Sequence, residues 1–181
     1  MVSDFDPRFG GAAFEVATAD SANNVAFGQQ INAGSRILGS RVAALSLPSG
    51  KFVGFFPVQV STSQGAVSAV DVTATNGSPA SSAALQPFAS LAWGDGTHSV
   101  LLEGARIAGT YLLAGAIGGG SIKMAEVDPS TGVPTEKASI APSSGPTSIS
   151  VASVEGRTFV FTTEGNLQVY EYAGGTRSPA G

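Results

Sequence analysis

Cysteine is absent from the 181-residue chain, and charged side chains are scarce. Without cysteine the chain forms neither a disulfide framework nor a thiolate metal site. Only 12% of the residues are charged, about half of the usual share for a globular domain, so Ser, Thr, Asn, Gln and Gly must cover much of the surface. The hydrophobic share of 43% is nevertheless enough for a folded core in a chain of this length.

Positive charge is also scarce, since nine Lys and Arg stand against thirteen Asp and Glu and are scattered along the chain. A chain without a basic patch lacks the electrostatic footprint of a protein that binds nucleic acid or anionic lipid, so we expect neither partner. No apolar run reaches the ~20 residues that span a bilayer. The first residues also lack the basic start and apolar core of a signal peptide, and we expect a soluble chain without membrane insertion.

What the sequence does contain is a repeated pattern of short strands. Its 24 Gly and ten Pro separate short runs that are rich in β-branched and aromatic residues. A unit of glycine, aromatic-apolar run and second, alternating run begins at Gly50, Gly109 and Gly156. Another apolar run precedes each glycine, at 41–47, 101–107 and 148–154. Each copy is therefore expected to hold at least three strands.

The last run of each copy aligns without gaps and ends in an acidic residue. The three runs are AVSAVDV at 66–72, SIKMAEV at 121–127 and NLQVYEY at 166–172. Asp71, Glu126 and Glu171 share one position of this alignment. The shared acid indicates that the copies are structurally equivalent.

A unit of three or four strands cannot bury both of its faces alone, so neighbouring units must stack face to face. The expected fold class is all-β, with repeated three- to four-stranded antiparallel units arranged as in a β-propeller, in a small ring or open arc of about three to four blades. The strand and turn pattern over residues 41–176 resembles the blades of lactonase-like and secreted RTX-type bacterial propellers. This resemblance implies the fold and carries little functional information.

The ends of the chain fit the repeat less well. Residues 1–40 are expected to form an atypical segment in which Phe9–Thr18 resembles an outer strand, and this strand would close the ring by pairing with the last, incomplete blade. Residues 177–181 are expected to form a flexible tail. In the rival arrangement an open arc of three blades leaves apolar faces uncovered, and these would have to be met by another chain or by self-association.

The acidic residues offer two interpretations. If Asp71, Glu126 and Glu171 converge on a central channel, their oxygens would hold a cation such as calcium. The favoured alternative is structural, with each acid accepting hydrogen bonds from the turn that follows its strand. Asp95 and Asp128 lie in Gly-containing turns as further metal candidates, but a calcium loop needs several acids at alternating positions, so turn formation is favoured there too.

Two other side chains are candidate functional residues. His98 is the one histidine of the chain, so a nucleophilic triad would have to use it, and no G-x-S-x-G motif accompanies it. We therefore predict no catalytic residues. Trp93 together with Phe88 is a candidate aromatic platform for a sugar, although a tryptophan buried in the core is the more common outcome.

Three classes of function follow from these features. The expected function is a non-catalytic propeller module that binds a protein or a glycan or has a structural role, including in a virion or surface assembly, at an extracellular or particle-surface location. The alternative is a propeller hydrolase of the lactonase or phytase type with a bound calcium ion. The third is a repeat fragment of a longer extracellular protein. No other cofactor is expected.

Overall fold

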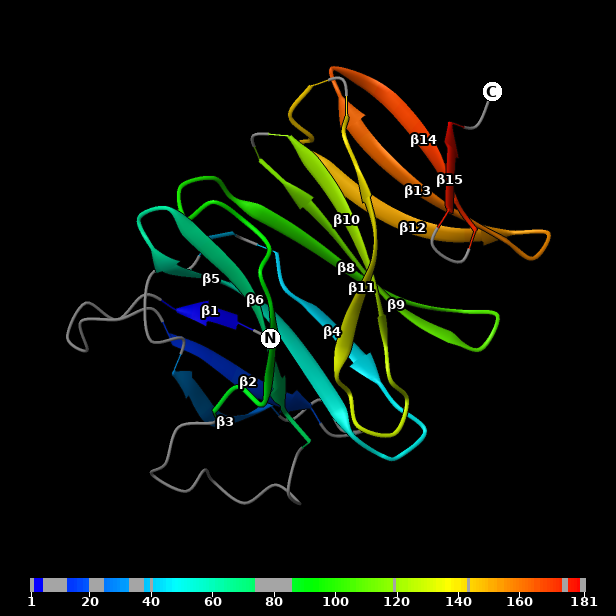
Figure 1. Ribbon diagram of the computed structural model, residues 1–181. Helices are drawn as coiled ribbons and strands as arrows, with labels where there is room; N and C mark the ends of the chain where they lie inside the picture. Colours follow the sequence, from blue (N-terminus) through cyan, green and yellow to red (C-terminus); the bar gives the residue numbers. More distant parts are fainter. Residues whose placement is uncertain are drawn as a thin grey trace.

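The computed structural model is built from antiparallel strands (Figure 1). It describes residues 2–4, 13–19, 25–32, 38–39, 41–73, 86–118, 120–142, 144–173 and 176–179. Within these ranges fifteen strands form one three-stranded and three four-stranded sheets. No helix in the same ranges has the length and apolarity that a membrane span requires. The expected all-β class with repeated antiparallel units is confirmed.

The three four-stranded sheets, here called blades 1 to 3, each follow the chain from strand to neighbouring strand. Blade 1 consists of β4 (Ala43–Ser46), β5 (Phe52–Ser61), β6 (Gln64–Asp71) and β7 (Ala89–Leu91). Blade 2 consists of β8 (Val100–Ile107), β9 (Thr110–Ile117), β10 (Ser121–Val127) and β11 (Pro134–Ile140). Blade 3 consists of β12 (Ser148–Val154), β13 (Arg157–Glu164), β14 (Asn166–Ala173) and β15 (Thr176–Pro179). Each copy of the sequence unit is therefore one blade with a fourth strand added.

The two ends of the chain differ from the expectation. The strands β1 (Val2–Asp4), β2 (Ala13–Ala19) and β3 (Val25–Asn32) form a sheet of their own. The described part of Phe9–Thr18 lies in β2, which pairs with β1 and β3, so the prediction that it closes a ring on the last blade is wrong. Blade 3 takes its fourth strand from residues 176–179, so residues 177–179 of the expected tail are part of a sheet. Residues 9–12, 180 and 181 lie outside the described residues.

The sheets are fanned out as an open arc in Figure 1, with β1 to β3 at the lower left and blade 3 at the upper right. The first strands of the blades lie side by side along the inside of this arc, because β8 contacts both β4 and β12. A parallel bridge between Arg41 and Leu101 joins the first two blades at this place. Neighbouring first strands that run in the same direction are what an arrangement of blades around an axis requires.

The strand register is the same in all three blades. The aligned acid always pairs with an apolar residue of the preceding strand: Asp71 with Val53, Glu126 with Leu112, and Glu171 with Phe159. Four residues earlier the pairing also agrees: Val67 with Pro57, Ile122 with Ala116, and Leu167 with Thr163. Residues that align without gaps in the three sequence copies therefore occupy equivalent positions in the three blades.

Two-residue turns explain the glycine that begins the second and third units. Ala108 and Gly109 connect β8 to β9 with φ of 48° and 85°, and Glu155 and Gly156 connect β12 to β13 with φ of 51° and 78°. Positive φ at both central residues defines a type I′ turn, whose twist matches that of the flanking strands. Glycine supplies the second of these positions without steric cost.

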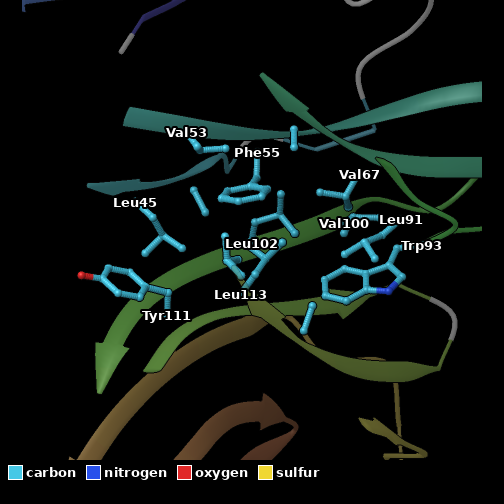
Figure 2. Close-up of a cluster of buried hydrophobic side chains, with 14 of the residues drawn as sticks. Leu45, Val53, Phe55, Val67, Leu91, Trp93, Val100, Leu102, Tyr111 and Leu113 are labelled. Carbon is cyan, nitrogen blue, oxygen red and sulfur yellow. The ribbon is translucent and has the colours of Figure 1, made fainter. Parts of the chain in front are cut away.

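Blade 2 is buried on both faces, because successive side chains of a strand point to opposite sides of the sheet. Leu113 joins Phe55, Leu102 and Trp93 in a cluster between blades 1 and 2 (Figure 2). Leu112, on the other face of β9, belongs to a second cluster with side chains of blade 3, including Ile149, Val160 and Tyr172. A strand with a neighbour on both faces needs a continuous apolar run, which explains the sequence of β9.

Trp93 packs so closely on Gly115 that the stack of blades depends on this glycine. A Cβ atom at Gly115 would lie 2.7 Å from two ring carbons of Trp93, which is fully buried. We predict that Gly115→Ala lowers the free energy of unfolding by about 1–3 kcal/mol, the usual cost of overpacking, as measured by denaturant unfolding. The cost should be smaller in a Trp93→Phe background, and an equal cost in both backgrounds would contradict this contact.

Candidate functional site

The three aligned acids do not meet at one common site, because Glu126 and Glu171 line the same hollow whereas Asp71 lies in blade 1. Asp71 accepts hydrogen bonds from the backbone N–H and the hydroxyl of Thr73, so the favoured turn interpretation is confirmed for this residue. Glu171 pairs with Arg157 within blade 3, and Glu126 contacts blade 3 from blade 2. No group of three or more His, Asp or Glu that could hold a metal ion occurs within the described residues.

Two of the candidate acids, Glu126 and Asp128, line one hollow at the end of β10. The hollow has a volume of about 340 Å³, and Tyr111, Thr135 and Lys137 also line it. Asp128 directly follows the last residue of β10, two positions after Glu126, and both residues line this opening. The end of β10 therefore places two carboxyl groups at the same opening.

Glu126 is held by contacts from two different elements. The hydroxyl of Tyr172, on blade 3, donates a hydrogen bond of 3.1 Å to Oε1 of Glu126. Lys137, on β11, brings its Nζ to 3.8 Å from Oε2. A second hollow of about 310 Å³ lies on the blade 3 side, and both Glu126 and Tyr172 line it. The carboxyl group of Glu126 thus lies where two blades and two hollows meet.

Asp128 is fixed by its own turn. Its Oδ1 accepts hydrogen bonds from the backbone N–H and the hydroxyl of both Ser130 and Thr131. These bonds, the one from the Thr131 N–H first, lower the pKa of Asp128 to about 2. Asp128 is therefore ionised at neutral pH. All four of these hydrogen bonds come from its own turn and end on Oδ1, which agrees with the favoured turn interpretation.

Glu171 lines the second hollow together with Glu126, and its carboxylate is paired with Arg157. Arg157 Nε donates to Glu171 Oε1 at 2.7 Å, and Arg157 Nη2 donates to Oε2. The hydrogen bonds from Arg157 lower the pKa of Glu171, and the same pairing raises the pKa of Arg157. This bidentate ion pair therefore lies beside Glu126 and Tyr172 at the second hollow.

Asp95 and His98 form an exposed turn without the geometry of a nucleophilic triad. Asp95 Oδ1 accepts bonds from the backbone N–H groups of Thr97 and His98, and these groups, that of His98 first, hold the pKa of Asp95 well below its usual range. Asp95 Oδ2 and the Thr97 hydroxyl both contact Nδ1 of His98, at 2.6 and 3.1 Å. A triad needs the acid and the nucleophile on opposite ring nitrogens.

Trp93 is not a sugar platform. Its side chain is fully buried in the cluster between blades 1 and 2, and its Nε1 donates a hydrogen bond of 2.7 Å to Glu136. The core position that the sequence favoured is confirmed, whereas Phe88 is 43% exposed. Trp93 contributes to stability and offers no surface to a ligand.

Two polar contacts were not predicted from the sequence. Tyr172 stands at a position that is valine in blades 1 and 2, at Val72 and Val127, and this single polar exception was the one available signal. Arg41 donates to Glu103 at 2.6 Å and to the carbonyl of Ile149 at 3.1 Å, which links the first strands of the blades. The partners of Arg41 are 62 and 108 residues away in the sequence, so no local sequence pattern predicts these contacts.

Titration of Tyr172 tests the contact with Glu126. Burial first, and then the hydrogen bond and charge of Glu126, raise the pKa of Tyr172 to about 12. The protonated phenol therefore contributes stability that is complete below about pH 10 and is lost as the pH rises toward 12. We predict that ultraviolet titration finds one of the three tyrosines ionising late. Glu126→Gln should lower that pKa, and an unchanged late pKa would contradict the contact.

Neither a protein-family model nor a curated protein matches the sequence. Among solved structures, an exo-β-1,3-galactanase from Phanerochaete chrysosporium with β-1,3-galactotriose is similar, with a TM-score of 0.57 and 12% identity over 97% of this chain and 45% of its own. The Bacteroides ovatus xyloglucan PUL GH43B protein has a TM-score of 0.45 and 15% identity, over 94% of this chain and 39% of its own. The chain thus spans less than half the length of either neighbour.

The likeness to the galactanase confirms the β-propeller-like fold, but it does not show the finer resemblance to lactonase-like or RTX-type propellers. The same likeness overturns the expected function, a non-catalytic binding or structural module with a lactonase- or phytase-type hydrolase as the alternative. The reason is that the neighbour with the TM-score of 0.57 is an exo-β-1,3-galactanase. Over nearly its whole length, this chain is similar in fold to a propeller enzyme that acts on a glycan.

Proposed function

We propose that this chain is part of a β-propeller that hydrolyses a glycan, and that the hollow around Glu126 and Asp128 receives the sugar. The observation that carries the proposal is the fold likeness to an exo-β-1,3-galactanase over 97% of the chain. That enzyme was solved with β-1,3-galactotriose. A β-linked galacto-oligosaccharide is therefore the first substrate class to test.

The chemistry of the hollow suits a sugar. Sugar hydroxyls both donate and accept hydrogen bonds, and ligand sites place a few polar groups of each kind in a concave opening. Glu126 and Asp128 offer acceptor oxygens, Lys137 offers a donor, and Tyr111 offers an aromatic side chain. The volume of about 340 Å³ is at the small end of the range for ligand pockets, which suits a single terminal sugar unit.

The two carboxyl groups have environments that suit different roles. Most glycoside hydrolases place two carboxyl groups on either side of the scissile bond, one as proton donor and one as base or nucleophile. Asp128, with its pKa lowered to about 2, stays ionised and is the proposed base. Glu126, with Oε1 oriented by Tyr172, is the proposed proton donor to the glycosidic oxygen.

Binding and hydrolysis of β-1,3-galactotriose test the proposal directly. We expect the wild-type chain to bind the trisaccharide in calorimetry and to release reducing sugar. Glu126→Gln should weaken binding by about tenfold or more, the effect of losing a hydrogen bond to a charged group, and should abolish release. Asp128→Asn should abolish release with a smaller effect on binding, because its Oδ1 remains an acceptor.

Matched controls separate the site from the fold. Asp71→Asn changes the acid that aligns with Glu126 but lies in blade 1, and Asp95→Asn changes an acid with the same turn geometry as Asp128. Both controls should keep wild-type binding and release. A wild-type chain that neither binds nor cleaves the trisaccharide, or a Glu126→Gln variant indistinguishable from Asp71→Asn, would contradict the proposal.

A further inference from the structure

The two hollows beside Glu126 are neighbours that share part of their walls. Thr110 and Glu126 line both of them. The first hollow, of about 340 Å³, also has Asp128 and Lys137 in its wall. The second, of about 310 Å³, has Arg157 of blade 3 in its wall. A molecule that crosses from one hollow to the other therefore passes the carboxyl group of Glu126.

The two type I′ turns border these hollows and leave space beside them. Gly109, in the turn between β8 and β9, lines the first hollow, and Gly156, in the turn between β12 and β13, lines the second. A Cβ atom built at Gly109 or Gly156 has no described neighbour within 4 Å. An extended ligand can therefore lie along the ends of both blades.

The second hollow offers hydrogen-bond donors and acceptors that suit sugar hydroxyls. Arg157 lines it, and the side chain of this residue is 58% exposed, so a ligand can reach it. The ion pair with Glu171 uses Nε and one hydrogen of Nη2, so Nη1 still has N–H groups to donate. The hydroxyls of Thr110 and Thr158, which also line this hollow, both donate and accept.

The charges of the second hollow favour a neutral sugar over an acidic one. Among the described residues that line it, Arg157 is the one cation, and its charge is balanced by Glu171. Glu126 adds a second carboxyl group to the same wall. A sugar carboxylate would therefore meet two carboxyl groups and a cation that is already paired, and like charges placed side by side lower affinity.

We propose that the second hollow binds the second sugar unit of the glycan, that this unit is neutral, and that Arg157 holds it. The inference rests on the proposed function, because it takes the terminal unit to lie in the first hollow. A disaccharide with one unit in each hollow has its linkage at the wall that the hollows share. This wall carries Glu126, the proposed proton donor to the glycosidic oxygen.

Calorimetry with sugars of increasing length tests the second hollow. The Asp128→Asn variant is the background for every measurement, so that the sugar is not cleaved. We expect β-1,3-galactobiose to bind at least about tenfold more tightly than galactose, the gain from hydrogen bonds to a charged group. β-1,3-Galactotriose should bind about as tightly as the disaccharide. A disaccharide whose second unit is a uronic acid should bind no more tightly than galactose.

Substitutions in the second hollow should affect the disaccharide alone. Arg157→Ala should weaken galactobiose binding by about tenfold and leave galactose binding unchanged, which also shows that the variant is folded. Thr158→Trp, which places a large ring in the second hollow, should have the same effect. Lys51→Ala is the matched control, because the shared register makes Lys51 of blade 1 the equivalent of Arg157. It should bind both sugars as the background does.

Three results would overturn the second hollow as a sugar site while the proposed function stands. They are equal affinity for galactose and galactobiose, an Arg157→Ala variant that matches Lys51→Ala, and loss of galactose binding in both Arg157→Ala and Thr158→Trp. Tight binding of the uronic acid disaccharide would overturn the preference for a neutral unit. A chain that binds neither galactose nor galactobiose would contradict the proposed function itself, and this inference with it.

Discussion

The need of each sheet to cover two apolar faces governs this structure. Strand alternation sends Leu113 toward blade 1 and Leu112 toward blade 3, so a blade in the middle of the arc has no solvent-facing side along β9. Such a sheet gains its stability from its neighbours and not from its own strands. The shared register, the type I′ turns and the small Gly115 all serve close face-to-face stacking of the blades.

The candidate site is a consequence of this stacking. Apolar side chains fill the middle of each blade interface, and polar side chains remain where the strands end. Glu126 is such a residue, and it becomes oriented because blade 3 places the Tyr172 hydroxyl 3.1 Å away. The equivalent acid of blade 1, Asp71, instead accepts a hydrogen bond from Thr73 of its own turn. The same repeat thus yields a structural acid in one blade and the proposed acid of a sugar site in another.

The sequence predicted what local pattern can determine. The copied unit gave the strands, their register and the place of the aligned acids, and Trp93 was correctly favoured as a core residue. It did not predict that β2 pairs only within its own sheet or that β15 completes blade 3, because strand partners depend on which edge is free in space. The Tyr172 to Glu126 contact spans 46 residues between two blades and has no local signature.

Methyl NMR of Met124 tests the stacking of blades most directly. The chain has two methionines, and Met124 is fully buried on the face of blade 2 turned toward blade 3, so selective methionine labelling gives one buried methyl signal beside that of Met1. The account predicts nuclear Overhauser contacts from the Met124 methyl group to side chains of blade 3, among them Ile149, Val160 or Tyr172. Contacts confined to β9, β10 and β11 would contradict it.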